Sequence, residues 1–116
     1  MGEVYLAKDQ KLDRQVAVKI LNEKFSNDES NLSRFIREAK AASALNHPNI
    51  LVIHEIGEAD GAHFIVSEYV EGETLRGILK EKPLELSKLL DIAIQIANAL
   101  STAHKAHLIH RDIKPE

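Results

Sequence analysis

A lysine in an apolar run and a glutamate in the segment that follows are the first residues of this sequence that could do chemistry. Lys19 lies within Val16–Leu21, which is rich in β-branched residues, and a charged side chain is costly there unless it has a partner or a ligand. A helix packed across the sheet would bring Glu38 to Lys19 and hold an ammonium that can face the phosphates of a nucleotide. The alternative interpretations are a solvent-facing lysine on an edge strand and an exposed carboxylate on a helix surface.

Short apolar runs and one longer periodic segment must position these two residues. The runs predict strands, and the resulting sheet should have about five short strands, with candidates at residues 4–7, 16–21, 50–56 and 64–70. The apolar spacing from about Asp28 to Leu45 predicts an amphipathic helix, which Pro48 would end. Residues 57–61 are rich in turn formers and predict a hairpin loop.

After Glu71–Glu73 the composition shifts from strand-like to helical, so we place a domain boundary there. Residues 74–82 and 86–107 are expected to be helices. In the second of these the polar residues form one narrow stripe, and the remaining apolar arc is too wide for a single neighbouring layer to cover. We therefore expect that helix to be covered by protein on several sides and the helical half to be incomplete.

Composition excludes several classes of protein. The 116 residues suggest one domain, 44% of them are hydrophobic and 28% charged, and the net charge of −3 gives no sign of nucleic acid as a partner. There is no cysteine, which excludes disulfides and thiolate metal sites and fits the cytoplasmic location that we expect. No apolar run reaches the roughly 18 residues of a membrane span.

The six histidines are candidate metal ligands. His104, His107 and His110 recur at a spacing of three, but zinc needs a further ligand, and the sequence has neither cysteine nor an H-E-x-x-H pattern. We therefore predict no metal site made by these residues. His54 and His63 are expected to lie across from one another in the predicted hairpin as a surface pair.

Several segments, in order, resemble the protein kinase superfamily, specifically its serine/threonine type. Met1–Tyr5 looks like the tail of a glycine-rich phosphate-covering loop, Val16–Ile20 (VAVKI) like the strand with the nucleotide lysine, and His110–Glu116 (HRDIKPE) like the catalytic loop. Arg37–Ile50 and Phe64–Leu75 also resemble kinase segments. The resemblance covers essentially the whole chain and implies transfer of the γ-phosphoryl group of ATP to Ser or Thr hydroxyls of a protein substrate, with Mg²⁺.

The resemblance also implies residue roles. Asp112 would accept or orient the proton of the attacking hydroxyl, and Lys114 would donate to the transferred phosphate, the form seen in kinases that act on Ser or Thr. Arg111 would pair with a phosphorylated activation loop. The implied nucleotide-binding residues belong to the glycine-rich loop, the lysine strand, the helix carboxylate and the hinge: Gly2, Val4, Ala17, Lys19, Glu38, Glu68 and Val70.

The chain departs from the family pattern at both ends. Gly2 is the only glycine of the glycine-rich loop, and neither the Asn nor the D-F-G motif that hold magnesium is present, so the metal ligands are expected beyond residue 116. We expect an α+β, kinase-like fold, with an N-lobe at residues 1–70 and the start of a helical C-lobe at residues 71–116. The isolated chain should show little or no activity, and the alternative is a non-catalytic nucleotide-binding or interaction module.

Overall fold

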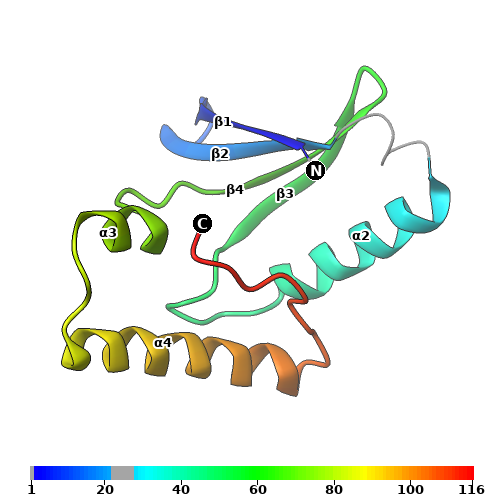
Figure 1. Ribbon diagram of the computed structural model, residues 1–116. Coiled ribbons are helices and arrows are strands. Elements are labelled where there is room, and N and C mark those ends of the chain that lie inside the picture. Colours follow the sequence, from blue (N-terminus) through cyan, green and yellow to red (C-terminus); the bar gives the residue numbers. More distant parts are fainter. Residues whose placement is uncertain (1, 22–27) are drawn as a thin grey trace. The chain divides into compact units, whose positions relative to one another are not determined.

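Four antiparallel strands form a sheet in the computed structural model, which describes residues 2–21 and 28–116 (Figure 1). The strands are β1 (Gly2–Asp9), β2 (Arg14–Leu21), β3 (Ile53–Ala59) and β4 (Ala62–Glu68), and their order in the sheet is β1-β2-β4-β3. The antiparallel sheet expected from the sequence is confirmed. Among the described residues it contains four strands, where about five were expected.

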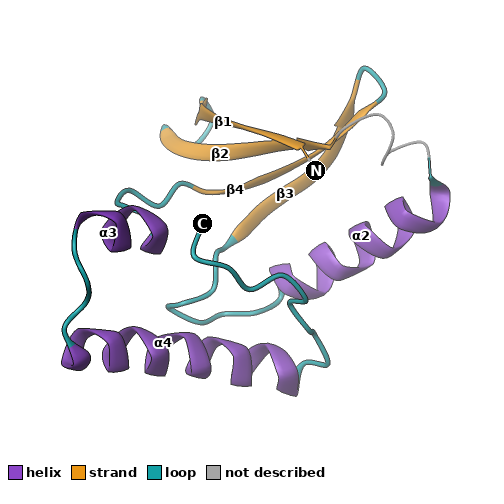
Figure 2. Cartoon of the chain, viewed as in Figure 1, coloured by secondary structure: helices purple, strands orange, loops and turns teal. Residues whose placement is uncertain are grey.

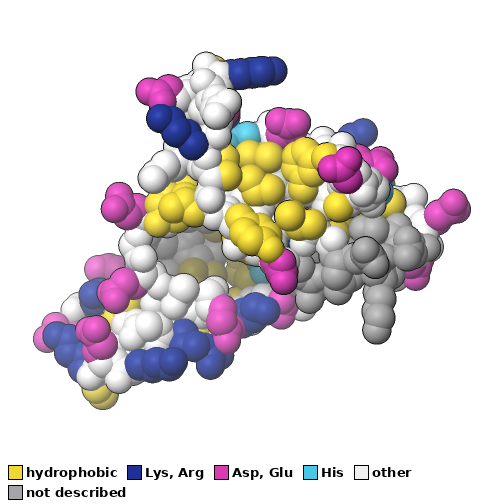
Figure 3. All heavy atoms as spheres, turned by 90° about the horizontal axis from the view of Figure 1, so that it is seen from above, with side chains coloured by type: hydrophobic (Ala, Val, Ile, Leu, Met, Phe, Trp, Pro, Cys, Tyr) yellow, Lys and Arg dark blue, Asp and Glu magenta, His cyan; other side chains and the backbone are white. Residues whose placement is uncertain are grey.

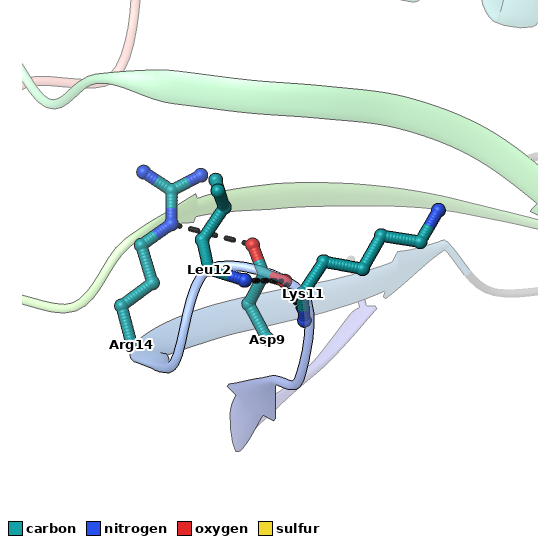
Figure 4. Close-up of polar contacts among 4 residues, drawn as sticks. All are labelled: Asp9, Lys11, Leu12 and Arg14. Atoms are coloured by element: carbon teal, nitrogen blue, oxygen red, sulfur yellow. Dashed lines mark hydrogen bonds and ion pairs between the residues drawn. The ribbon is translucent and has the colours of Figure 1, made fainter.

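The turn between β1 and β2 is organised by one carboxylate (Figure 4). Oδ1 of Asp9 accepts hydrogen bonds from the amides of Lys11 (3.0 Å) and Leu12 (3.2 Å), and Oδ2 accepts one from Nε of Arg14 (3.3 Å). These bonds to the ionised form, the one from the Leu12 amide first, lower the pKa of Asp9 from its ordinary 3.8. Asp9 therefore ties the end of β1 to the start of β2, and so helps to fix the register of the two strands.

The β3–β4 hairpin is tighter than expected. The predicted loop over residues 57–61 is wrong, because β3 continues to Ala59 and the connection is the two-residue turn Asp60-Gly61. Both turn residues have positive φ, 51° and 77°, as a type I′ turn requires. Gly57 lies inside the strand opposite Phe64, and a Cβ at this position would overlap the Phe64 ring. This glycine therefore serves a close approach of a side chain and does not mark a turn.

The expected pairing of His54 with His63 is wrong. Ile53 pairs with Ser67 but Glu55 pairs with Val66, so the register shifts at His54. His63 lies opposite Glu58, and its Nε2 is 3.5 Å from Oε2 of that glutamate. The two-residue turn sets this register, because it places Ala62 opposite Ala59 and therefore His63 opposite Glu58, whatever the shift near His54.

Helix α2 (Glu29–Ser43) contacts β3 and covers part of the sheet (Figure 1). Its N-cap is Asp28, whose side chain accepts hydrogen bonds from the amides of Ser30 and Asn31. The small core contains residues of the two middle strands and of the helix: Val16, Leu21, Ala39 and the polar Ser67. Apolar side chains of β1 remain exposed, and hydrophobic side chains gather on the face seen in Figure 3.

The described chain divides into two units. The first contains the sheet and α2 (Met1–Asn46 and Leu51–Tyr69), and the second combines His47–Ile50 with Val70–Glu116. Within the second unit Nδ2 of Asn49 donates to Oε1 of Gln95 (3.1 Å), which attaches the short segment to a helix.

The second unit is helical, as expected from the sequence (Figure 2). It contains α3 (Leu75–Glu81) and α4 (Leu86–Lys105). No residue of α4 is buried, and several of its large apolar side chains are exposed, among them Leu86, Leu90 and Ile94.

Candidate functional site

Three of the residues assigned to nucleotide binding lie on one face of the sheet. Val4 of β1 pairs with Lys19 of β2, and Leu6 pairs with Ala17. Directly opposite residues point to the same face, and residues two apart on a strand share that face. Val4, Ala17 and Lys19 therefore form one surface, in which apolar side chains adjoin an ammonium.

Lys19 is half-buried, and its cross-strand neighbour on β4 is Ile65. Glu38, on α2, is also half-buried. Among the ion pairs between described residues, none joins Lys19 to Glu38, although Glu38 is not without a partner. The structure thus places both residues in the same unit, and their pairing stays a prediction.

The end of β4 is tied to the segment before β3 by Glu68. The Glu68 amide donates to the carbonyl of Val52 (2.9 Å), and the Val52 amide donates to Oε1 of Glu68 (2.8 Å). The Glu68 amide is therefore occupied. The Glu68 carbonyl accepts a hydrogen bond from the Ser67 hydroxyl (3.3 Å) and keeps a second lone pair that it can offer to a base. Ser67, one residue earlier, is buried and lies opposite Ala17, on the same face as that residue.

The two remaining nucleotide-binding candidates lie at the margins. Gly2 is the first residue of β1 and pairs with Leu21. Val70 belongs to the second unit and is 65% exposed.

The sheet has a hollow of about 740 Å³ on its other face. Val16, Val18 and Val66 line it together with residues of the β1–β2 turn. None of the predicted site residues lines this hollow, so the hollow is separate from the surface that carries Lys19.

The catalytic candidates of the second unit lie in the segment after α4. Nζ of Lys114 is 3.0 Å from Oδ2 of Asp112, and both side chains are about half exposed. The Asp112 amide donates to Nδ1 of His110 (3.3 Å). Arg111 has a φ of 67°, a left-handed conformation that is uncommon for a residue other than glycine and is frequent at functional sites. The structure brings Asp112 and Lys114 together as a carboxylate–ammonium pair in an exposed loop.

Sequence reasoning missed one contact of this loop. The Arg76 amide, in the first turn of α3, donates to the carbonyl of Pro115 (2.9 Å), and the Arg76 guanidinium forms an ion pair with Glu116. No sequence signal predicts this contact, because it joins residues far apart in the chain and depends on the geometry of the first turn of α3, which the sequence does not specify.

The described part of the chain contains no group of three His, Cys, Asp or Glu residues that could hold a metal ion, so we assign no magnesium ligand there. Among the same residues, no helix combines the length and the apolar character needed to cross a membrane.

Comparisons with known proteins show similarity along the whole chain. The model of the protein kinase domain family matches residues 1–116. The serine/threonine-protein kinase PrkC of Bacillus subtilis is 49% identical over 116 residues, and PknB of Mycobacterium tuberculosis is 42% identical over 120 residues. Each alignment covers 99% of this chain but only 18% and 19% of those proteins.

Solved structures give the same result for the fold. The crystal structure of the PknI kinase domain of Mycobacterium tuberculosis superposes with a TM-score of 0.87 at 36% identity, and covers 99% of this chain and 47% of that one. The chain thus spans about half of a solved kinase domain and less than a fifth of the two relatives named above. With a matching family model along its whole length, this chain belongs to the protein kinase domain family.

Proposed function

We propose that these 116 residues form the nucleotide-binding part and the start of the catalytic loop of a serine/threonine protein kinase. The intact protein would transfer the γ-phosphoryl group of ATP to Ser or Thr hydroxyls of a protein substrate. The names of the relatives support the serine/threonine class. The observation that carries the proposal is the shared face of Val4, Ala17 and Lys19, because it combines a surface for a flat base with a cation for phosphate.

On this surface each residue has a distinct task. The small apolar side chains of Val4 and Ala17 can approach the flat face of adenine without a clash. The Lys19 ammonium binds phosphate oxygens, and Glu38 would fix that ammonium once a nucleotide is present. The carbonyl of Glu68 and the backbone of Val70 are proposed to bind the base edge, and the Gly2 amide is proposed to approach the phosphates.

Asp112 and Lys114 would act at the transferred group. Phosphoryl transfer offers little covalent work to a protein, so catalysis depends on positioning and on charge. The Asp112 carboxylate would accept a hydrogen bond from the attacking hydroxyl. The Lys114 ammonium, which is now paired with Asp112, is exposed enough to turn toward a phosphate that carries more negative charge.

Magnesium, when bound, would neutralise charge on the phosphates. The described residues contain no group of three His, Cys, Asp or Glu that could hold it, and we derive no step through the metal.

The test compares Lys19→Met with Lys11→Met in the intact protein. Lys11 is an exposed lysine of the β1–β2 turn and serves as the matched control. We expect the wild type to transfer radiolabelled γ-phosphate from ATP to protein. Lys19→Met should lower the rate of transfer at least about a hundredfold, which is the usual scale of electrostatic stabilisation, and Lys11→Met should change it less than about twofold. ATP binding without any transfer by the wild type would contradict the proposal and favour the non-catalytic module, for which the exposed apolar residues of α4 would be a docking surface.

A further inference from the structure

We propose that Arg76 is a positioning residue that clamps the catalytic loop from α3 and so sets the geometry of Asp112 and Lys114. This inference rests on the proposed kinase function. Arg76 would touch neither ATP nor the acceptor hydroxyl, and would act only through the residues that follow Lys114.

The segment after α4 is anchored well at its start. The amides of Ala106 and Leu108 donate to the carbonyl of Ala103, at 3.0 and 2.9 Å, and the His107 amide donates to the carbonyl of His104 at 2.9 Å. These bonds close the C-terminal turn of α4. They end at Leu108, before the residues assigned to catalysis.

Beyond Leu108 the Asp112 amide is held locally by Nδ1 of His110 (3.3 Å), and Arg76 attaches the end of the segment to α3. Between described residues, residues 109–116 make a single backbone–backbone hydrogen bond, the one from the Arg76 amide to the carbonyl of Pro115. The same arginine pairs through its guanidinium with the carboxylate of Glu116. Two consecutive loop residues are thus held by the backbone and the side chain of one residue of α3.

Helix capping explains why the Arg76 amide is available. The first amides of a helix have no partner within it. Thr74 is the N-cap, and its side-chain oxygen accepts from the Gly77 amide at 3.1 Å. The Ile78 amide reaches the carbonyl of Thr74. The Arg76 amide lies in the first turn, where no carbonyl of α3 can accept from it, and Pro115 supplies the acceptor.

The clamp reaches Lys114 and Asp112 through a stiff connection. Pro115 has a fixed φ and restricts the residue before it, which is Lys114, to extended conformations. Holding the carbonyl of Pro115 therefore limits the directions in which the Lys114 side chain can leave the backbone. Asp112 lies two residues before Lys114 and directly after the left-handed Arg111, and its 3.0 Å pair with Lys114 depends on that direction.

The expected size of the effect is moderate. The Arg76 and Glu116 side chains are 52% and 47% exposed, and exposed ion pairs stabilise weakly because water and salt screen them. The backbone bond survives when the side chain is truncated. Arg76→Ala should therefore lower kcat about tenfold, less than the roughly hundredfold that a misplacement of 1 Å can cost.

The test measures kcat and the KM for ATP in the intact protein for Arg76→Ala, Arg76→Lys, Glu116→Gln and Arg76→Pro. Lys80→Ala, which removes another exposed cation from α3, is the control. We expect Arg76→Ala and Glu116→Gln to lower kcat with a KM within about twofold, Arg76→Lys to recover most of it, and Arg76→Pro, which also removes the amide, to have the largest effect. Lys80→Ala should match the wild type.

Hydrogen exchange supplies a readout independent of activity. Peptides that cover residues 109–116 should exchange faster in Arg76→Ala, while those of α4 and the melting temperature stay unchanged. The inference is overturned if both Arg76→Ala and Arg76→Pro keep the wild-type kcat, or if Lys80→Ala lowers kcat as much as Arg76→Ala does. It is also overturned if the Arg76 variants lose kcat together with a lower melting temperature and a higher KM. If the wild type transfers phosphate but the Arg76 variants do so equally well, the inference fails alone. If the wild type transfers none, the proposed function fails, and the positioning role fails with it.

Discussion

Val4 of β1 and Lys19 of β2 lie directly opposite each other, so an exposed apolar side chain and a half-buried ammonium share one face of the sheet. The next residue of β1, Tyr5, pairs with Val18 and points to the other face. Register alone therefore separates the surface that we assign to the nucleotide from the surface above the hollow.

Truncation of these neighbours on β1 should distinguish the two faces. Val4 and Tyr5 are 63% and 48% exposed, so neither contributes much to the core. Val4→Ala should weaken ATP binding about fivefold, from the apolar area no longer covered by the base, whereas Tyr5→Ala should leave the affinity unchanged. Isothermal titration of both variants checks this, and equal effects would contradict the assignment of the faces.

The carboxylate of Asp9 should make the stability of the sheet depend on pH at the acid end. Its pKa is lowered in the folded state, chiefly by the Leu12 amide, so the stabilisation is present above the ordinary value of 3.8 and is lost as pH falls through the lowered pKa. Asp9→Asn keeps an acceptor for the amides but cannot titrate. We expect the difference in unfolding free energy between wild type and Asp9→Asn to be constant above about pH 5 and to shrink below pH 3.8.

Asp9→Ala is the companion variant, because it removes the acceptor as well as the charge. It should be less stable than Asp9→Asn at neutral pH. A pH-independent difference between wild type and Asp9→Asn would show that Asp9 does not act as an ionised acceptor in this turn.

Two glycines should respond in opposite directions to alanine. A Cβ on Gly57 would overlap the Phe64 ring, so Gly57→Ala should destabilise the protein by about 1–3 kcal/mol. A Cβ on Gly77 of α3 meets only the Thr74 hydroxyl at 3.5 Å, so Gly77→Ala should stabilise its unit by about 0.5–1 kcal/mol. Denaturant unfolding measures both, and a neutral Gly57→Ala would mean that Phe64 moves aside without cost.

Sequence periodicity was sufficient for most of the elements and insufficient for the details between them. The apolar, β-branched run Val16–Leu21 predicted a strand and the helical spacing over Asp28–Leu45 predicted a helix, and β2 and α2 formed there. The β3–β4 hairpin was misjudged at Gly57, because a glycine that makes room for an aromatic ring has the same local signal as a turn glycine.

The candidate site was likewise predicted from the sequence only in part. The motif around Asp112 identified a loop, and the structure shows Asp112 paired with Lys114 within it. The contact from Arg76 to Pro115 and Glu116 could not be predicted, because it depends on where α3 starts relative to a distant loop. The Lys19–Glu38 pair was predicted from the order of the elements, and it still awaits a structure with nucleotide bound.

The most direct test of the account is phosphoryl transfer by Asp112→Asn in the intact protein, with Asp91→Asn, an exposed aspartate of α4, as the control. We predict that Asp112→Asn lowers kcat at least about a hundredfold, the scale of a lost proton acceptor, while its affinity for ATP stays within about twofold. Asp91→Asn should equal the wild type. Transfer by Asp112→Asn at close to the wild-type rate would contradict the assignment of the catalytic loop and, with it, the proposed function.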